Sequence, residues 1–289
     1  MPTSRAVLIT GCSSGIGAAT AARLAEKGWI VYATARRPET LGDLEAKGCR
    51  TLALDVNDEA SCRAAVDRVV EEEGAVGVLI NNAGFSQSGA VESIPDDRVR
   101  AQFETNVFGM LSMCRAALPS MRAQGWGKLV NISSMGGEFV FPGGGVYHAT
   151  KYAIEALSDA LRYELAGFGV DVIVIQPGLI KSDFSTRTVA EIDAVAADAG
   201  PYAAFNAAVA TASKEAYEKG LVARLGGPPE AVAEVIEKAI SAEKPKTRYK
   251  VTPSARLMMT LHSVAGDRGW DRICRSSFPQ PGRDGRVST

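Results

Sequence analysis

The sequence predicts an α/β fold, a parallel β-sheet covered by helices, on the strength of two observations. Short apolar runs rich in β-branched residues alternate with longer segments of helical periodicity along most of the chain. The first run, Ala6–Thr10, leads through the glycine-rich turn Gly11–Gly17 into an Ala-rich helix over Ala18–Lys27, which Gly28 ends. Continuous apolar strands are typical of sheets buried on both faces, and strand–turn–helix units are typical of parallel sheets.

Length and composition exclude several classes of protein. The chain of 289 residues has room for two average domains or one large α/β domain, and its net charge of −1 gives no support to a nucleic-acid or acidic-membrane partner. No apolar run approaches the roughly 18 residues of a membrane span, and the N-terminal one is too short for a signal peptide. We therefore expect a soluble protein without an integral membrane segment.

The cysteines and histidines argue against a metal site. The five cysteines are scattered without C-x-x-C or zinc-ligand spacing, and the chain has only two histidines. Free thiols fit a reducing compartment, so a cytoplasmic location is expected.

The glycine turn after the first strand predicts a phosphate-binding loop. Such a turn aims backbone N–H groups and a helix N-terminus at a diphosphate, and glycine lets the ligand approach the backbone. The spacing is G-x-x-x-G-x-G, and the alternative is an ordinary strand-to-helix turn. The residues expected to contact the cofactor here are Gly11, Ser13, Ser14, Gly15, Ile16 and Gly17.

The second strand, Trp29–Ala35, ends at two arginines rather than at an acidic residue. A carboxylate at this point would bind the ribose 2′-hydroxyl and repel a 2′-phosphate, whereas Arg36 and Arg37 offer bidentate donors to phosphate. We therefore predict NADP(H) rather than NAD(H), against the alternative of two solvated loop arginines.

The third and fourth strands also end in polar residues. Thr51–Leu54 leads to Asp55 and Val56, where Asp55 either hydrogen-bonds an adenine amino group or, with Asn57, caps the amphipathic helix Asp58–Glu73. Val76–Ile80 leads to the four residues Asn81, Asn82, Ala83 and Gly84. These residues either let a ribose approach the backbone or lock the sheet edge to a neighbouring loop.

A long helical region is expected from Pro95 to about Gln124, with Pro119 interrupting it. It contains Asn106 among apolar neighbours, an unfavourable mid-helix residue that either hydrogen-bonds buried groups or holds a water near the site. The fifth strand, Lys128–Ser133, then delivers Ser133 and Ser134 to its C-terminal end, where catalytic groups gather in open α/β sheets.

Tyr147 and Lys151 are the candidate proton-transfer pair. They are four residues apart in a predicted helix that ends near Gly167, so their side chains share one helical face. A phenol has a pKa near 10, but an ammonium at roughly 4–5 Å would favour the phenolate by about 3–4 kcal/mol and lower that pKa by up to about 2–3 units. The alternative is an exposed Tyr and a solvated Lys on a surface helix.

The C-terminal part is expected to cover the site. The sixth strand, Val170–Ile175, closes at Gln176-Pro177-Gly178, and the irregular segment 183–227, with helical pieces over Ala190–Ala199 and Pro201–Lys219, is interpreted as a substrate lid. A helix from Pro228 to about Ala242 and a last strand, Arg248–Val251, follow.

The chain ends in a C-terminal extension, residues 253–289. Its apolar residues between Ala255 and Phe278 are expected to pack on the domain or the lid. A membrane-surface role is the alternative, although Asp267 and Asp271 break its basic face.

These motifs together resemble the short-chain dehydrogenase/reductase family over roughly residues 5–182. The likeness rests on Thr10–Gly17, Asn81–Gly84, Asn106, Ser134 placed thirteen residues before Tyr147, Tyr147-x-x-x-Lys151, and Pro177-Gly178. It implies a single doubly wound Rossmann domain over 1–289, with a seven-stranded parallel sheet. The region 29–38 and Arg248-Tyr249 are similar to the branch that contains 17β-hydroxysteroid and retinol dehydrogenases, which suggests a lipophilic alcohol or carbonyl substrate.

The resemblance also implies roles for individual residues. Tyr147 is expected to act as general acid/base, Lys151 to lower its pKa and hold the nicotinamide ribose, Ser134 to bind the substrate oxygen, and Asn106 to position a relay water. The cofactor set then extends to Asp55, Val56, Asn82, Ala83, Gly84, Tyr147, Lys151, Pro177, Gly178, Ile180 and Ser182. Ser182 and Thr150 stand where the family usually has Thr and Ser. A homodimer or homotetramer through the Phe103 and Tyr152 helices is expected.

Two other functions fit the same fold. One is a non-catalytic NADP(H)-sensing or scaffold protein, which typically lacks the Tyr or the Lys. The other is a sugar-nucleotide epimerase or dehydratase, whose larger substrate domain and different glycine spacing this chain does not offer.

Overall fold

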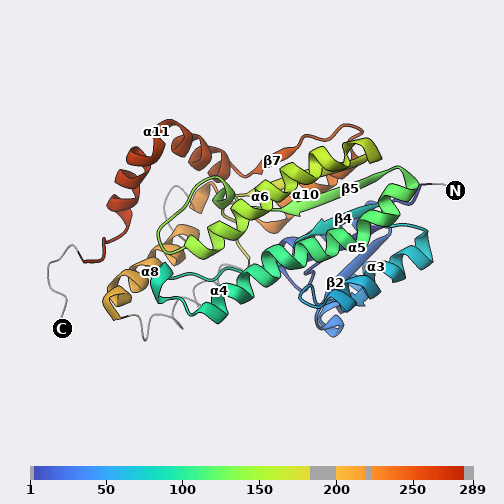
Figure 1. Ribbon diagram of the computed structural model, residues 1–289, viewed down its shortest axis with the longest axis horizontal. Helices are drawn as coiled ribbons and strands as arrows, with labels where there is room; N and C mark the ends of the chain where they lie inside the picture. Colours follow the sequence, from blue (N-terminus) through green and yellow to red (C-terminus); the bar gives the residue numbers. More distant parts are fainter. Residues whose placement is uncertain (1–2, 183–199, 219–222, 283–289) are drawn as a thin grey trace.

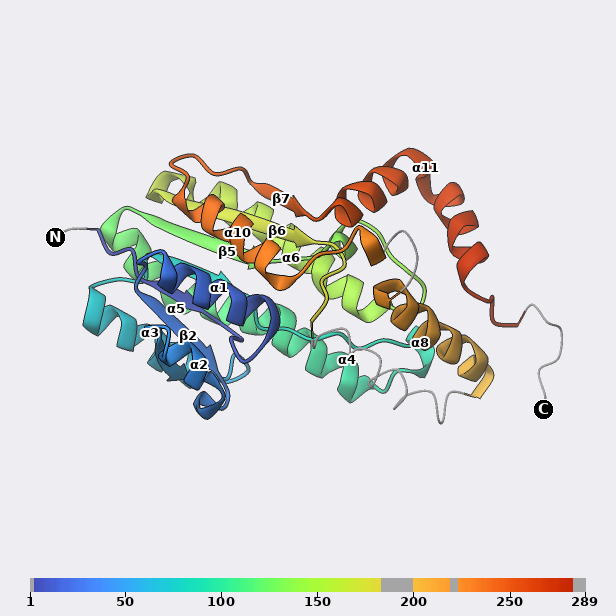
Figure 2. The same ribbon diagram turned by 180° about the vertical axis from the view of Figure 1, so that it is seen from behind.

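Seven parallel strands form one sheet in the computed structural model, which describes residues 3–182, 200–218 and 223–282. Their spatial order is β3-β2-β1-β4-β5-β6-β7, so the chain winds outward from β1 in both directions and the predicted doubly wound, seven-stranded sheet is confirmed (Figures 1 and 2). The strands are β1 (Val7–Ile9), β2 (Val31–Ala35), β3 (Arg50–Ala53), β4 (Val78–Asn81), β5 (Gly127–Ile132), β6 (Val170–Pro177) and β7 (Arg248–Val251).

Helices connect the strands and cover both faces of the sheet. The α-helices are α1 (Gly15–Glu26), α2 (Gly42–Glu45), α3 (Glu59–Glu73), α4 (Asp96–Phe103), α5 (Gly109–Gln124), α6 (Gly145–Leu165), α8 (Ala203–Glu218), α10 (Pro229–Ser241) and α11 (Pro253–Ser277). The π-helical segment η3 (Glu104–Phe108) joins α4 to α5. Short 3₁₀ turns are η1 (Pro38–Leu41), η2 (Val91–Ser93), η4 (Met135–Gly137), η5 (Ala166–Phe168) and η6 (Gly200–Tyr202).

The strands are apolar on both faces because each face is covered. Val7 and Ile9 of β1 pack in the layer formed with α1 and α10, whereas Leu8 between them packs in the opposite layer with α3, α5 and α6. This alternation follows from the period of two in a β-strand. Figure 1 shows α3, α5 and α6 in front of the sheet, and Figure 2, the view from the other side, shows α1 and α10 in front of its opposite face.

Two smaller apolar clusters lie beyond the carboxyl edge of the sheet. One joins Met135 and Phe139 of the loop after β5 to Met258, Met259 and Trp270 of α11. The other joins α8 to the loop after β4 through Ala90, Phe205 and Val209. Helix α11 bends at Gly266, whose φ is 60° and ψ is 179° (Figure 1). The predicted packing of the tail on the domain is therefore confirmed for Met258, Met259 and Trp270, whereas Leu257, Leu261 and Val264 are exposed.

Several element predictions need correction. Helix α1 begins at Gly15, not at Ala18, and Pro119 lies inside α5 without ending it. The buried neighbours Leu118 and Met121 pack on the sheet on either side of that proline, and such packing offsets the roughly 3 kcal/mol that proline costs in a helix. The predicted helical piece Ala190–Ala199 lies outside the described residues.

Across the described ranges, no helix combines the length and apolar character needed to cross a membrane. In the same ranges no three or more His, Cys, Asp or Glu side chains gather as metal ligands would.

Candidate active site

The glycine loop at the end of β1 leaves no space for a side chain at Gly11 or Gly17. Gly11 and Gly15 have φ angles of 71° and 59°, which favour glycine. A Cβ added to Gly17 would lie 2.3 Å from the carbonyl oxygen of Gly11 and 2.6 Å from Nδ2 of Asn82. The loop therefore turns at glycines, which carry no side chain, and leads into α1.

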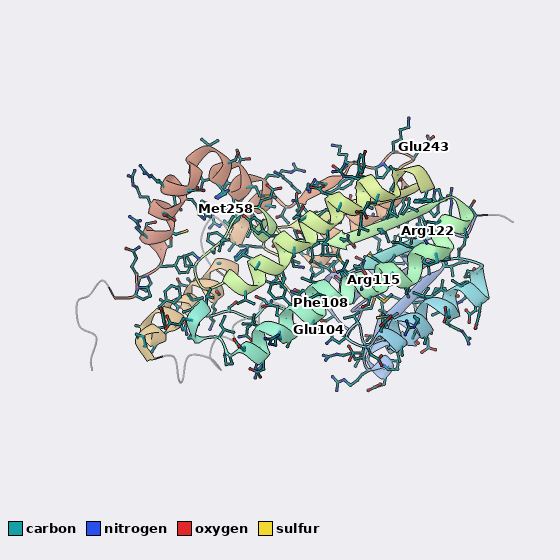
Figure 3. The ribbon with its side chains drawn as sticks, viewed as in Figure 1. Glu104, Phe108, Arg115, Arg122, Glu243 and Met258 are labelled. Carbon is teal, nitrogen blue, oxygen red and sulfur yellow. The ribbon has the colours of Figure 1, made fainter. Side chains whose placement is uncertain are left out.

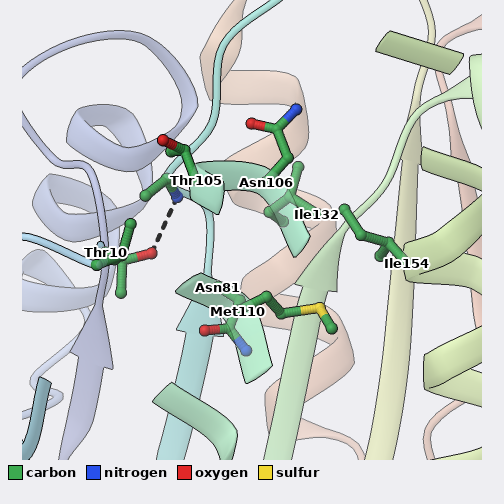
Figure 4. A pocket seen from close by; sticks show the side chains of 9 residues that line it. Thr10, Asn81, Thr105, Asn106, Met110, Ile132 and Ile154 are labelled. Atoms are coloured by element: carbon green, nitrogen blue, oxygen red, sulfur yellow. Dashed lines mark hydrogen bonds between the residues drawn. The ribbon is translucent and has the colours of Figure 1, made fainter. Parts of the chain in front are cut away.

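The residues after β4 lock this loop in place. Asn82 Nδ2 donates to the carbonyl oxygens of Thr10 and Gly11, both at 2.9 Å. Thr10 Oγ1 accepts from the backbone N–H groups of Asn82 at 3.0 Å and Ala83 at 2.9 Å (Figure 4). Of the two alternatives for these residues, the locking one is observed. Thr10 had been given no role, although a hydroxyl residue between a strand and a glycine turn is a signal for such an acceptor.

A small cavity lies behind the loop, between β1, β4, β5 and η3 (Figure 4). Its volume of ≈ 10 Å³ suits one water molecule at most and is too small for a substrate. Asn81, on its wall, donates from Nδ2 to Asn131 Oδ1 at 2.9 Å, while its own Oδ1 is buried without a partner in the described part of the chain. Any substrate must therefore bind outside this cavity.

Tyr147 and Lys151 lie on the first two turns of α6, as predicted. Lys151 Nζ is 5.6 Å from the centre of the Tyr147 ring and donates to the carbonyl oxygen of Ile132, at the end of β5, at 2.8 Å. Burial lowers the pKa of Lys151 from 10.5 to about 8, against the opposing charge of Glu155. The amine is thus held inside the protein beneath the phenol ring, not in solvent.

Ser134 begins the loop between β5 and α6. Its Oγ accepts from the backbone N–H of Gly136 at 3.0 Å and caps η4. Ser133, the other serine at the end of this strand, is buried, and its Oγ has no partner within the described ranges.

His148 ties this loop to α6. Its Nδ1 bonds to the carbonyl oxygen of Gly136 at 2.9 Å and its Nε2 accepts from the N–H of Phe141 at 3.3 Å. Burial lowers the pKa of His148, so the ring is neutral at physiological pH. Sequence reasoning had assigned it no role.

Asn106 lies in the π-helical segment η3 and is buried. Its Oδ1 accepts from Phe85 N at 3.1 Å, and its Nδ2 donates to Phe85 O and to Thr150 Oγ1, each at 3.0 Å. Thr150 in turn donates to the carbonyl oxygen of Tyr147 at 2.7 Å. Asn106 therefore hydrogen-bonds buried groups, as one of the two alternatives proposed, and joins the loop after β4 to the helix of Tyr147.

The residues predicted to hold the adenosine end lie at the ends of β2 and β3. Arg36 and Arg37 are exposed, and neither guanidinium forms an ion pair within the described part of the chain. Asp55 Oδ1 accepts from the N–H of Asn57 at 3.0 Å. The residue that caps α3 is Asp58, so the alternative that Asp55 caps this helix with Asn57 is wrong. Val56 packs against Gly109 of α5.

The segment after β6 reaches over the glycine loop. A Cβ added to Gly15 would lie 3.6 Å from Cβ of Ser182. Gly178 packs on Ser254 at the start of α11, and Ile180 pairs with Gly227. The structure thus brings the glycine loop, Tyr147, Lys151 and the segment 177–182 to one edge of the sheet, as the sequence predicts.

The loop and the start of α1 fit a nucleotide diphosphate. Ser14, at the N-cap of α1, makes no side-chain capping hydrogen bond, and no acidic residue occupies the first turn. A helix N-terminus that carries bare amides behind glycine backbone is a ready anion site. The same edge also presents two exposed guanidinium groups and a buried amine beside a phenol. This arrangement suits proton transfer next to a bound dinucleotide.

Comparison with known proteins agrees with this geometry. Residues 5–194 match the family model described as short chain dehydrogenase. The 3-ketodihydrosphingosine reductase of Bacteroides thetaiotaomicron is 38% identical over 255 residues, which cover 87% of this chain and 89% of that protein. The NADPH-dependent 3-dehydrocapnine reductase of Ornithobacterium rhinotracheale is 34% identical over 280 residues, covering 93% and 95%.

Solved structures of similar fold include a short-chain dehydrogenase from Streptomyces avermitilis, with a TM-score of 0.75, 33% identity and coverage of 94% of this chain and 98% of that one. A serine dehydrogenase complexed with NADP+ has a TM-score of 0.74 at 26% identity, covering 86% and 94%. A Burkholderia phymatum enzyme in complex with NAD has a TM-score of 0.77 at 25% identity, covering 90% and 93%.

Proposed function

The chain belongs to the short-chain dehydrogenase family of oxidoreductases, and we propose that it interconverts an alcohol and a carbonyl with NADP(H), using Tyr147 as the general acid/base. The observation that carries the proposal is the buried Lys151 amine, 5.6 Å from the centre of the Tyr147 ring. A solvated Lys on a surface helix would have no such contact.

The dinucleotide would lie across the carboxyl edge of the sheet. The backbone of Gly11–Gly17 and the start of α1 would hold its diphosphate, and Lys151 its nicotinamide ribose. When bound, the cofactor supplies or accepts a hydride, which is the redox part of the reaction.

The protein's own residues move the proton. In the reductive direction the Tyr147 hydroxyl gives its proton to the carbonyl oxygen as the carbon gains the hydride, which leaves an alcohol and a phenolate. The Lys151 ammonium stabilises that phenolate by charge. In the oxidative direction the phenolate accepts the alcohol proton. General acid/base catalysis of this kind contributes roughly 10²–10⁴-fold.

Ser134 and Asn106 would support this step. The Ser134 hydroxyl, on the loop between β5 and α6, would donate to the substrate oxygen. The two N–H groups of the Asn106 side chain bond to Phe85 and Thr150, so its contribution would be to hold the helix turn of Tyr147 and the backbone beside a relay water.

The preference for NADP(H) rests on Arg36 and Arg37, two exposed and unpaired cations at the end of β2 in the described part of the chain. An NADPH-dependent relative and an NADP+-bound structural neighbour support it, although another neighbour binds NAD. Guanidinium groups bind a 2′-phosphate by charge-assisted hydrogen bonds, which NAD(H) cannot form.

The substrate proposed is a lipophilic alcohol or ketone. Two relatives are named as reductases of 3-keto and 3-dehydro compounds. Apolar clusters that include Phe139, Phe205 and Trp270 lie beyond the carboxyl edge. Within a single domain, the described part of the predicted lid, 200–218 and 223–227, would cover the substrate and the extension after 253 would support it; residues 183–199 and 219–222 of the predicted lid lie outside the described residues.

A homodimer or homotetramer through α4, α5 and α6 is proposed with this activity. Glu104, Phe108, Arg115 and Arg122 run along the outer side of η3 and α5 (Figure 3). Phe108 is 51% exposed, and Tyr152 of α6 is 42% exposed. Exposed aromatic residues of this kind are enriched in interfaces between proteins.

NADPH oxidation in the presence of a panel of carbonyl compounds tests the proposal. The wild-type protein should reduce at least one lipophilic ketone, and Tyr147→Phe should lower kcat by about 10²–10⁴-fold while NADPH affinity stays within about threefold. NADPH binding without turnover of any carbonyl would instead favour the sensing or scaffold function.

A further inference from the structure

Glu155 is a buried carboxylate one helical turn after Lys151, and the proton transfer described above does not use it. It is 8% exposed, and positions four apart on a helix are neighbours, with about 5–6 Å between their Cβ atoms. A buried carboxylate is costly unless it is paired and hydrogen-bonded. The groups that pair with the Glu155 carboxylate therefore indicate why it is buried.

Two neighbouring strands hold this carboxylate. Gln176 of β6 donates from Nε2 to Glu155 Oε1 at 3.0 Å, and Arg248 of β7 donates from Nε to Glu155 Oε2 at 2.9 Å. Arg248 also donates to Asp159 Oδ2 at 2.8 Å, one turn further along α6. Each carboxylate oxygen of Glu155 thus has a donor from a different strand, which fixes its orientation.

The approach of α6 to the sheet here depends on a residue without a side chain. A Cβ added to Gly137 of η4 would lie 2.9 Å from Cγ of Glu155 and 2.8 Å from Oγ of Ser133. Gly137 therefore lies next to both Glu155 and Ser133, and Ser133 follows Ile132, whose carbonyl oxygen accepts the Lys151 amine.

We propose that Glu155, oriented by Arg248 and Gln176, is a positioning residue that keeps the buried Lys151 amine protonated and aimed at Tyr147. Burial among apolar residues favours the neutral amine, whereas a fixed carboxylate one turn away favours the ammonium. Arg248 limits this effect, because its positive charge partly cancels that of Glu155. The consequence for turnover rests on the proposed function, but the electrostatic effect on Lys151 does not.

Other charged groups surround the pair and must be considered. Glu138, in the loop after β5, accepts from the same Gln176 amide at 2.8 Å and pairs with Lys250 of β7 at 3.5 Å. On α6 itself, Asp159 is paired with Arg248 and Arg162, and the phenols of Tyr147 and Tyr152 share the helix. The titration of Lys151 must therefore be followed on its own amine, separately from these neighbouring groups.

Direct titration of the Lys151 side chain by NMR tests the proposal. Protein labelled with ¹³C at the lysine ε-carbons is followed over neutral and alkaline pH, and Lys151→Met assigns the signal. Glu155→Gln, which keeps the shape but removes the charge, should move the Lys151 midpoint to lower pH by roughly one unit or more. Arg248→Met should move it to higher pH, because the Glu155 charge is then less compensated.

Two controls separate charge from structure. Arg248→Lys keeps the cation and should restore a midpoint near that of the wild type. Arg162→Met removes an exposed arginine that pairs with Asp159 but not with Glu155, and should leave the midpoint unchanged. If Glu155→Gln does not fold, the Lys151 midpoints of the Arg248 variants and of Arg162→Met still test the proposal. An unchanged midpoint in the charge variants, or shifts of Glu155→Gln and Arg248→Met in the same direction, would overturn the proposal.

A kinetic readout links this inference to catalysis. With NADPH and phenanthrenequinone as a carbonyl probe, the alkaline fall in kcat should move with the NMR midpoint in each variant. Absence of any turnover by the wild type, with the midpoints shifted as expected, would count against the proposed function and leave the role of Glu155 standing. Turnover by the wild type with no midpoint shift in the variants would count against the role of Glu155 and leave the proposed function standing.

Discussion

The two sides of the site are held together by different forces. On the proposed cofactor side, the loop Gly11–Gly17 is held by contacts at Gly11 and Gly17 that are too close for a side chain, and by four hydrogen bonds in which Thr10 or Asn82 takes part. On the proposed substrate side, α11 meets the loop after β5 through an apolar cluster that includes Met135, Met258 and Met259, and α8 meets the loop after β4 through Ala90, Phe205 and Val209. Hydrogen bonds and steric exclusion permit one geometry, whereas methionine-rich contacts adapt to different shapes.

The difference indicates how one scaffold serves its two ligands. A diphosphate needs several N–H groups at set positions, so its loop tolerates no change of volume. The lipophilic substrate that we propose would need only an apolar surface of about the right shape, so the side chains that line its site can vary. Substitutions on the two sides should therefore differ in size and in which ligand they affect.

The largest effect is expected from Gly17→Ala. Its Cβ would lie 2.3 Å from the Gly11 carbonyl oxygen, so the loop or α1 must move. We expect the free energy of unfolding in urea to fall by about 3 kcal/mol or more and NADPH binding to be lost. Gly42→Ala is the matched control, because Gly42 has a φ of −54° and open space around it. It should be neutral or slightly stabilising. A Gly17→Ala protein as stable as wild type would contradict the account of the loop.

Lys151→Met should change how stability depends on pH. The pKa of Lys151 is lowered to about 8 in the folded protein from 10.5, so between these values the unfolded chain binds more protons. The free energy of unfolding of the wild type, relative to the variant, should therefore rise with pH across this window by up to about 3 kcal/mol and be flat below it. Urea unfolding of both proteins at several pH values measures this difference. Subtracting the two free energies of unfolding cancels the pH-dependent contribution of the buried cysteines, which both proteins contain. A flat difference would mean that the amine is solvated.

Replacing Arg36 and Arg37 by Ala should alter only the choice of cofactor. We expect NADPH affinity, measured by fluorescence titration, to fall about 10–100-fold, because charge-assisted hydrogen bonds to the 2′-phosphate are lost. NADH affinity should be unchanged. Arg122→Ala, an exposed arginine on α5, is the control. Tighter binding of NADH than of NADPH by the wild type would refute the predicted preference.

The smallest effect is expected on the substrate side, from Trp270→Phe. The change removes the hydrogen bond from Trp270 Nε1 to Val140 O, 2.8 Å long, and part of a ring packed on Phe139. We expect a loss of about 1 kcal/mol of stability and a change in KM for the carbonyl substrate. NADPH affinity should be unchanged, and a large loss of it would show that the two sides are not independent.

Most of the sheet could be predicted because buried parallel strands are marked by continuous apolar runs. The last strand, Arg248–Val251, was predicted at its observed bounds, and α3 within one residue. The start of α1 was set too late because Gly15 and Gly17 have low helix propensity, whereas their place is decided by contacts with Asn82 and Gly11. Pro119 and the π-helical segment around Asn106 likewise depend on tertiary packing.

The candidate site could be predicted where the residue type itself limits the chemistry. Glycines before a helix and a Tyr four residues before a Lys can be recognised from the sequence alone. The network of Glu155, Gln176 and Arg248 is not, because its members come from α6, β6 and β7 and no local spacing relates them. Asp55 shows the limit in the other direction, since the sequence offered Asp55 with Asn57 as the cap of the next helix, whereas the hydrogen bonds show that Asp58 caps it.

The central claim is that Tyr147 and Lys151 face a dinucleotide held by the glycine loop, and a crystal structure of the NADPH complex tests it most directly. The account predicts the diphosphate at the N-terminus of α1, the 2′-phosphate beside Arg36 and Arg37, and the nicotinamide ribose hydrogen-bonded to Lys151 Nζ with the Tyr147 hydroxyl next to the nicotinamide ring. A nicotinamide bound away from Tyr147, or a Lys151 amine turned to solvent, would contradict it.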